Sequence, residues 1–392
     1  MNILQIVPSI SLIYGGPSQM VRGLSAAQAR QGANVTVLTT DSNGDIDQPP
    51  LDVPLAQPVA EDGYTVIYFR CSPFRRYKFS LGLLSWLRQN AQNYDIAHIH
   101  ALFSPVSTAA AAIARQQALP YLMRPLGTLD PADLQKKRRF KQLYVSLFER
   151  ANLAGAAAIH FTSPQEAKVS ERFGLTTRDL VMPLGVSLPP FSQSDAQAAQ
   201  QVRQHFGIAE NLPIVLFMSR IDPKKGFDLL LPALEQQQTP FHFILCGANP
   251  QDRDYERAIA AQIEASPLAE HTTLTGFVSG ELKAQLLQAA DLFVLPSYYE
   301  NFGIAVAEAM MAGKPVVISD QVHIAPNIQA SESGWVVPCA AAPLARALAA
   351  ALNHPAERQR RGENAKQYAV EHYSWDAIAA QTLTAYQQIL KN

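Results

Sequence analysis

The stretch PSYYENFGIAVAEAM, at residues 296–310, is the most informative part of this 392-residue chain for its fold. It follows an apolar run at 292–296 that predicts a buried strand, and its own apolar spacing predicts a helix that begins near Phe302. Glu300 is then expected in the loop after the strand, and Glu308 about a turn and a half inside the helix. A strand that leads directly into a helix is the repeating unit of a doubly wound α/β sheet.

The same alternation of short apolar runs and helical patterns extends along the whole chain. In the second half the predicted strands lie at 214–219, 241–246, 272–275, 292–296 and 316–319. In the first half they lie at 3–7, 35–39, 96–100, 121–124 and 157–161. This pattern predicts two α/β domains, each with a parallel sheet covered by helices, and the chain is long enough for two hydrophobic cores.

A stretch rich in Pro, Ser and Gln at 189–201 predicts the linker between these domains. We therefore expect a first domain at 1–188 and a second at 189–374. The remaining residues, 375–392, have apolar side chains at helical spacing and predict an amphipathic C-terminal helix.

The composition excludes several classes of function and location. Lys and Arg number 32 against 33 Asp and Glu, so no overall positive field indicates a nucleic-acid partner. Three widely separated cysteines fit neither a disulfide framework nor a thiolate metal site, and suit a reducing cytosol. Residues 1–10 lack the basic start of a signal peptide, and no run approaches the roughly 20 apolar residues of a spanning helix. A cytoplasmic location is expected.

Doubly wound sheets bind ligands beyond the carboxyl ends of their strands, so the loops that follow strands are the first candidates. Gly15 and Gly16 follow the first strand and could let the backbone approach a phosphate or sugar, although a plain strand-to-helix turn explains them equally well. Arg220 and Lys225, in the segment SRIDPKKG at 219–226, could clamp a diphosphate. A solvated charged loop is the alternative.

The loop and helix start at 300–308 offer groups that could bind a sugar and a phosphate. The carboxylates of Glu300 and Glu308 can accept hydrogen bonds from sugar hydroxyls. The backbone N–H groups of Gly303 and Ile304, at the predicted helix start, could receive a phosphate. For either Glu alone, a capping or surface role is the alternative.

The spacing of Glu300 and Glu308 resembles the E-x7-E motif of retaining glycosyltransferases with the two-domain GT-B fold, and its setting is similar to glycosyltransferase family 4. Further blocks agree in order and spacing: the glycine loop at 15–17, the paired cations Arg220 and Lys225, and the base-contacting loop GFV at 276–278. The resemblance covers nearly the whole chain. It implies two Rossmann-like domains that face each other across a cleft, with a C-terminal helix that crosses back to the first domain.

The resemblance also implies a role for each matching residue. Arg220 and Lys225 would hold the donor diphosphate, and Glu308 would bond the nucleotide ribose. Val278 would meet the base. Glu300 and the backbone of Asn301, Phe302, Gly303 and Ile304 would face the sugar and its phosphate. Gly15 and Gly16 would complete the donor site from the first domain.

His100 and Arg124 end predicted strands of the first domain and are candidates for the acceptor side, His100 also as a catalytic residue. A lone His at such a position has a structural role as its alternative. Leu126 stands where related enzymes often carry a His, so that residue's role has no counterpart here.

The run Lys136–Lys141 (KKRRFK) precedes Leu143 and Leu147, which continue the helical spacing of Phe140. It predicts either a solvated helix face or a surface that meets anionic lipids and brings the site to a lipid-linked acceptor.

These observations together predict an enzyme that moves a sugar from a UDP-sugar, with UDP-glucose as the expected donor, to a glycan or lipid-linked acceptor in polysaccharide or exopolysaccharide biosynthesis. A sugar-nucleotide epimerase of GT-B type and a non-catalytic nucleotide-sugar-binding module are the alternatives. No metal is expected at the site, because its cations and helix start supply positive potential. Two D-x-D sequences, Asp252–Asp254 and Asp45–Asp47, are instead expected at a helix entry and in a polar loop.

Overall fold

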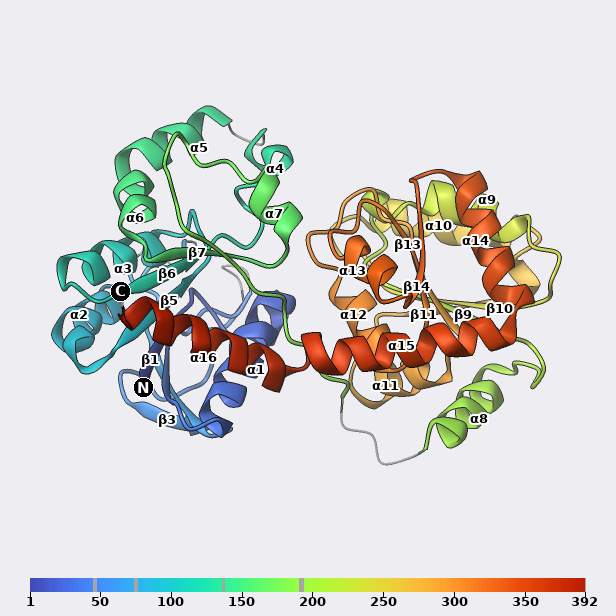
Figure 1. Ribbon diagram of the computed structural model, residues 1–392, viewed down its shortest axis with the longest axis horizontal. Helices are drawn as coiled ribbons and strands as arrows, with labels where there is room; N and C mark the ends of the chain where they lie inside the picture. The colour runs from blue at the N-terminus through green and yellow to red at the C-terminus, as the bar shows by residue number, and fades with distance from the viewer. Residues whose placement is uncertain (45–47, 74–76, 136–137, 190–193, 392) are drawn as a thin grey trace. The chain divides into compact units, whose positions relative to one another are not determined.

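The computed structural model describes residues 1–44, 48–73, 77–135, 138–189 and 194–391. The chain forms two compact units, one of residues 1–185 with 375–392 and the other of residues 186–374 (Figure 1). The first unit ends slightly before the expected limit of 188, because Val186 N already donates a hydrogen bond to Tyr373 O of the second unit. Among the described helices, none has the length and apolar character needed to cross a bilayer.

The first unit is built on an eight-stranded sheet with the order β3-β4-β2-β1-β5-β6-β7-β8. Its strands are β1 Asn2–Ile6, β2 Asn34–Thr40, β3 Pro58–Glu61, β4 Tyr64–Phe69, β5 Ile96–His100, β6 Tyr121–Arg124, β7 Ala158–Phe161 and β8 Asp179–Val181. All neighbours pair in parallel except β3 and β4, which form an antiparallel edge. The chain order reverses on the two sides of β1, so the switch point of this sheet lies between β1 and β5.

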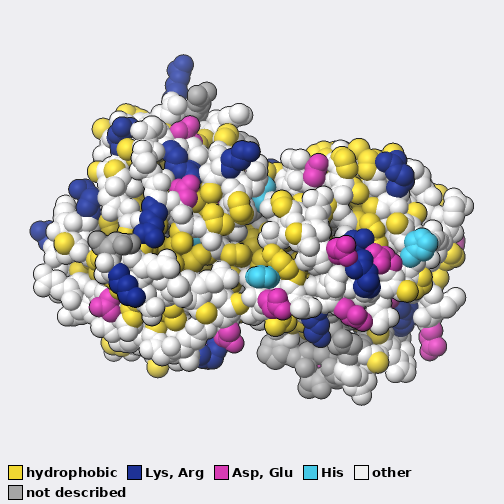
Figure 2. Space-filling view, viewed as in Figure 1, with side chains coloured by type: hydrophobic (Ala, Val, Ile, Leu, Met, Phe, Trp, Pro, Cys, Tyr) yellow, Lys and Arg dark blue, Asp and Glu magenta, His cyan; other side chains and the backbone are white. Residues whose placement is uncertain are grey.

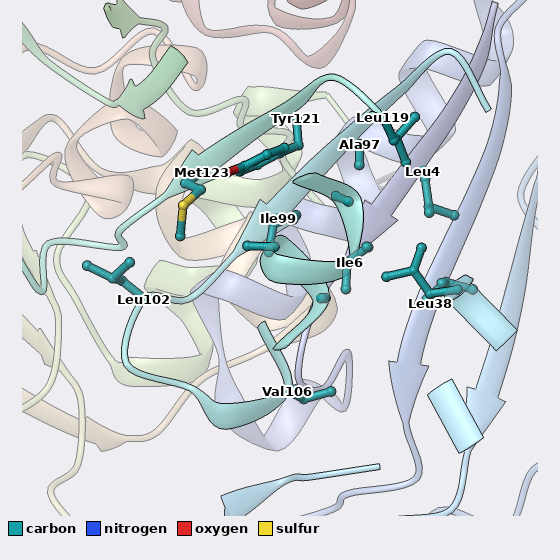
Figure 3. Close-up of a cluster of buried hydrophobic side chains, with 14 of the residues drawn as sticks. Leu4, Ile6, Leu38, Ala97, Ile99, Leu102, Val106, Leu119, Tyr121 and Met123 are labelled. Carbon is teal, nitrogen blue, oxygen red and sulfur yellow. The ribbon is translucent and has the colours of Figure 1, made fainter. Parts of the chain in front are cut away.

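Helices surround this sheet, and one core lies beneath them. They are α1 Gly16–Arg30, α2 Leu81–Asn90, α3 Pro105–Gln116, α4 Pro131–Gln135, α5 Arg138–Tyr144, the π-helical turn η4 Val145–Glu149, α6 Arg150–Gly155, α7 Pro164–Val169 and α16 Trp375–Lys391. Leu4 and Ile6 of β1 pack with Ile99 of β5, Met123 of β6 and Val106 of α3 (Figure 3). Each such buried apolar side chain contributes about 1.5–3 kcal/mol to stability.

The C-terminal helix α16 packs against α1 of the first unit, which confirms the predicted return of the chain to this domain. The indole ring of Trp375 fills the space beside Gly23 and Gly185, where an added Cβ would lie 2.4 Å and 2.1 Å from ring carbons. Farther along α16, the hydroxyl of Tyr386 lies 2.7 Å from His98 Nδ1 inside the unit. Both apolar and polar contacts therefore fix this helix.

The second unit is built on a six-stranded parallel sheet with the order β11-β10-β9-β12-β13-β14. Its strands are β9 Ile214–Met218, β10 His242–Cys246, β11 Thr272–Gly276, β12 Leu292–Leu295, β13 Val316–Ser319 and β14 Gly334–Val337. Its helices are α8 Asp195–Phe206, the short η5 Pro223–Lys225, α9 Phe227–Glu235, α10 Arg253–Glu264, α11 Gly280–Ala289, α12 Ile304–Met311, α13 Ala325–Ala330, α14 Ala341–Asn353 and α15 Pro355–Tyr373. The predicted architecture of two doubly wound α/β domains is confirmed.

Candidate active site

Two of the predicted loops meet at the switch point of the second sheet. Strands β9 and β12 pair in parallel although β10 and β11 lie between them in the sequence. The loops that follow β9 and β12 therefore leave the same edge of the sheet, at the position where such sheets bind ligands. The two loops are in direct contact, since Tyr298 N donates to Lys224 O at 2.8 Å.

The side chains of Lys225 and Glu300 form an ion pair across these loops. Lys225 Nζ donates a hydrogen bond to Glu300 Oε2, and the side chains are only 12% and 23% exposed. Partial burial strengthens such a charge-assisted bond, and each charge compensates the desolvation of the other. The cation expected at the diphosphate and the carboxylate expected at the sugar are thus partners of one another.

Two glycines allow the close packing of these loops. Gly226 follows Lys225 with φ 74°, and a Cβ there would lie 2.3 Å from Pro296 O at the end of the β12 strand. Gly303 has φ 82° and precedes α12, which begins at Ile304, two residues after Phe302, near which the sequence predicted its start. The left-handed backbone at Gly303 delays the helix start. The first N–H groups of α12 consequently point out of the helix beside the Glu300 loop.

Glu308 lies inside α12 and forms a second ion pair that the sequence did not reveal. Its side chain is almost fully buried, and Lys283 Nζ of α11 donates to Glu308 Oε1 at 2.6 Å. Burial raises the pKa of Glu308, and the Lys283 ammonium opposes this rise. Lys283 therefore keeps a carboxylate charged in a buried position, where it can accept hydrogen bonds from ribose hydroxyls.

Lys283→Met is expected to lower the free energy of unfolding by about 1–3 kcal/mol at pH 8, because the buried Glu308 carboxylate loses its charged donor. Without Lys283 the pKa of Glu308 rises further. A carboxyl group whose pKa is higher in the folded than in the unfolded state stabilises the folded state only at low pH. This contribution is lost as the pH increases through the pKa of the folded state. The difference in the free energy of unfolding between the wild type and this variant should therefore become smaller as the pH is lowered from 8 to 5. Urea unfolding provides the measurement.

The exposed Lys366 of α15 provides the matched control. Lys366→Met should lower the free energy of unfolding only slightly, and by the same amount at pH 5 and pH 8. Adding Glu308→Gln to Lys283→Met should restore much of the lost stability at pH 8. An equal deficit for Lys283→Met at pH 5 and pH 8 would contradict the pairing.

The side chains of Val278 and Phe302 are buried. Val278 is only 8% exposed, whereas its neighbour Phe277 is 79% exposed and is the apolar side chain that this loop presents to solvent. Phe302 is 3% exposed and packs edge-on against the Tyr373 ring at 5.4 Å. Both belong to the core, so mainly their backbone groups remain for a ligand. Next to them, Asn301 Oδ1 is buried and has no hydrogen-bond partner among the described residues.

In the first unit, Gly15 and Gly16 form the start of α1 after strand β1, beside the switch point of that sheet. Gly15 has φ 69° and precedes α1, which begins at Gly16. A Cβ at Gly15 would meet no atom within 4 Å, so the backbone there is open to a ligand. A turn and an anion site both remain compatible with this geometry.

His100 and Arg124 are neighbours at the carboxyl ends of β5 and β6, where they are paired in register. His100 is 1% exposed, and its Nε2 lies 2.8 Å from Gln5 Oε1. Burial holds the pKa of His100 well below its usual value, and the Arg124 charge lowers it further. His100 thus lies below the surface beside Gln5 and His98, and its Nδ1 is buried without a hydrogen-bond partner among the described residues.

Arg124, beside His100, also has unused hydrogen-bonding capacity. Its side chain is 4% exposed, and Nε and Nη1 have no hydrogen-bond partner among the described residues. Burial lowers the pKa of Arg124 to about 10. A buried guanidinium with open donors at a strand end suits a polar or anionic group of a ligand.

Of the two D-x-D sequences, Asp252–Asp254 lies within the described residues. Asp252 is the N-cap of α10 and accepts a hydrogen bond from Tyr255 N at 3.0 Å, as expected for a helix entry. Residues 45–47 are outside the described residues. Within the described ranges, no cluster of three or more His, Cys, Asp or Glu side chains is arranged to hold a metal ion.

Comparisons with known proteins agree with this architecture in both halves of the chain. The family model of the glycosyl transferase 4-like domain matches residues 15–185, and that of glycosyl transferases group 1 matches residues 199–368. The D-inositol 3-phosphate glycosyltransferase of Xylanimonas cellulosilytica is 27% identical over 396 aligned positions, which cover 96% of this chain and 92% of that protein. The α-D-kanosaminyltransferase of Streptomyces kanamyceticus is 28% identical in an alignment that covers 69% of this chain and 73% of that protein.

Solved structures show the same fold. Sucrose-phosphate synthase from Thermosynechococcus elongatus superposes with a TM-score of 0.76 at 24% identity, covering 100% of this chain and 99% of that chain. Anabaena HepE in complex with UDP and glucose superposes with a TM-score of 0.72 at 23% identity, covering 99% and 100%. Two doubly wound domains, an E-x7-E pair at a switch point and two matching family models lead to one assignment. The chain belongs to the group 1 family of glycosyltransferases, family 4, whose members are retaining enzymes of GT-B fold that transfer a sugar from a nucleotide-sugar donor.

Proposed function

We propose that this chain transfers a hexosyl group from UDP-glucose to a glycan or lipid-linked acceptor in polysaccharide biosynthesis. The observation that carries the proposal is the meeting of Lys225, Glu300 and the α12 N-terminus at the β9/β12 switch point. The choice of UDP-glucose is supported by the likeness to HepE, whose crystals contain UDP and glucose.

The proposed chemistry uses fixed charges of the second unit. As the bond between sugar and diphosphate breaks, negative charge grows on the leaving phosphate oxygens. Arg220, Lys225 and the first N–H groups of α12 stabilise that charge without having to reorient. Glu300 holds the Lys225 ammonium in place, and the leaving phosphate accepts the proton of the acceptor hydroxyl.

On the acceptor side, Arg124 is the residue of the first unit best suited to bind a polar or anionic acceptor group. His100 then acts as a positioning residue, because it is paired in register with Arg124 and buried beside it. Gly15 and Gly16 offer backbone N–H groups to the donor phosphate.

The test is release of UDP from UDP-glucose with and without a panel of glycan and lipid-linked acceptors. Transfer predicts release that depends on the acceptor and a product in which the anomeric configuration is retained. An epimerase would change UDP-glucose without an acceptor. A binding module would show a thermal shift with UDP-glucose and no turnover.

Transfer is expected to need no divalent metal, because Arg220, Lys225 and a helix N-terminus already surround the proposed diphosphate position with positive potential. The measurement is the initial rate in excess EDTA against the rate with added Mg²⁺ or Mn²⁺, which should agree within about twofold. Activity that disappears with EDTA and returns with metal would reject this mechanism, since Mg²⁺ and Mn²⁺ would then need oxygen ligands near the donor.

A further inference from the structure

A continuous helical stretch of the first unit, α5, η4 and α6 at residues 138–155, exposes its apolar side chains to solvent. Phe140 is 66% exposed, Leu143 58%, Leu147 63% and Phe148 55%. We refer to these four residues as the apolar stripe. The opposite face of the same stretch is buried in the unit through Val145, Glu149, Asn152 and Leu153. Monomeric proteins rarely expose a contiguous apolar patch unless it binds something.

The apolar stripe is continuous along the helix surface. Phe140, Leu143 and Leu147 recur at spacings of three and four residues, which places them on one face of the helical stretch, and Phe148 lies at its border. The ring of the half-buried Tyr144 joins them, with centroids 6.4 Å from Phe140 and 5.3 Å from Phe148. The stripe therefore presents one apolar surface and not scattered side chains.

Basic residues accompany the stripe. The sequence KKRRFKQLYVSLFER at 136–150 contains six Lys or Arg and one acid, Glu149. Glu149 is buried, accepts a hydrogen bond from Thr108 at 2.5 Å, and has its pKa raised by burial. Because the whole chain has a net charge of −1, this is a local concentration of positive charge.

The cations flank the apolar stripe on the helix surface. Arg139 and Lys141 are one residue before and after Phe140, which places them about 100° to either side of it. Arg139 is exposed, and Lys141 Nζ lies 5.4 Å from the Phe103 ring. In the upper part of the first unit, where Figure 1 draws α5, Lys and Arg side chains project beside hydrophobic ones (Figure 2).

We propose that the apolar stripe and its flanking cations bind the surface of a bilayer that contains anionic lipids. The helix would lie in the membrane plane, with Phe140, Leu143 and Leu147 at the boundary between headgroups and acyl chains and Arg139 at the lipid phosphates. A second copy of the chain fits this surface poorly, because a symmetric contact would bring Arg139 and Lys141 of each copy together. The inference does not depend on the proposed sugar transfer.

The test uses the full chain and large unilamellar vesicles of phosphatidylcholine alone or with 30% phosphatidylglycerol. We expect sedimentation with the anionic vesicles, little with the neutral ones, and weaker binding at high salt. Phe140→Ser/Leu147→Ser and, separately, Arg139→Glu should each lower the partition coefficient about tenfold or more, since binding needs both apolar area and charge.

Matched controls lie on the second unit. Val370→Ser replaces an apolar side chain that is 49% exposed, and Arg257→Glu replaces a cation whose side chain is 78% exposed. Both should bind vesicles like the wild type, and all variants should keep the wild-type Tm. The proposal is overturned if wild-type protein does not sediment with anionic vesicles or if Phe140→Ser/Leu147→Ser binds them normally. A lipid-independent dimer that the same double variant abolishes would also overturn it and assign the stripe to a second copy.

Discussion

Glu300→Ala is expected to lower kcat for sugar transfer by about 100-fold to 1000-fold, the loss typical for one fixed electrostatic group at a reacting centre. Its carboxylate holds the Lys225 ammonium beside the α12 N-terminus. Affinity for UDP should stay constant or increase, because Lys225 no longer has an internal anion that competes with the diphosphate. Rates from UDP release and affinities from calorimetric titration would show the two effects separately.

Glu308→Ala provides the contrast within the same motif. Its carboxylate pairs with Lys283 and is assigned to the ribose, so this variant should lose nucleotide affinity. The exposed Glu281 of α11 is a matched control, and Glu281→Ala should change neither quantity. If Glu300→Ala and Glu308→Ala both transferred sugar at near the wild-type rate, the assignment of the E-x7-E pair would be wrong.

The sequence predicted the central strands accurately because they are buried on both faces. All ten expected strands are present, with ends that differ by no more than one residue. The strands β3, β4, β8 and β14 were not expected. Among them, β3 and β8 are short edge strands with exposed residues, which weaken the apolar pattern. The β3–β4 hairpin did have a signal, since Asp62-Gly63 joins the two strands and Gly63 has φ 79°.

Part of the candidate site could be predicted, because its charged residues directly follow predicted strands. These residues are Arg220, Lys225 and Glu300, and the resemblance assigns all three to the donor. Lys225 and Glu300 meet because loops after neighbouring parallel strands leave the same edge of the sheet. The partner of Glu308 was not predictable in this way. Lys283 lies on a separate helix, 25 residues before Glu308 in the chain, and only the packing of α11 beside α12 brings them together.

The burial of His100 was equally hidden from the sequence. Its position at the end of β5 suggested an accessible group, but its neighbour His98 bonds Tyr386 of α16, 288 residues away. The C-terminal helix therefore helps to enclose the polar cluster that holds His100. The sequence pattern of a single strand does not show that a helix from the C-terminal end of the chain buries its side chains.

Lys225→Ala and Arg220→Ala are expected to weaken UDP binding by about tenfold to 150-fold each, which corresponds to a charge-assisted contact of about 1.5–3 kcal/mol. Lys225→Ala should have the larger effect, because it also leaves the Glu300 carboxylate unneutralised beside the diphosphate. Adding Glu300→Gln to Lys225→Ala should then recover part of the affinity. Calorimetric titrations with UDP and with uridine provide the measurement.

The comparison of the two ligands distinguishes a diphosphate clamp from a general loss of structure. Uridine lacks the diphosphate, so its affinity should be the same in the wild type and in both variants, whereas unfolding of the loop would weaken both ligands. Lys224→Ala is the matched control, since Lys224 is exposed and adjacent to Lys225. It should leave UDP binding within about twofold of the wild type, because a solvated charge contributes little. Unchanged UDP affinity in both Arg220→Ala and Lys225→Ala would place the diphosphate elsewhere on the second unit.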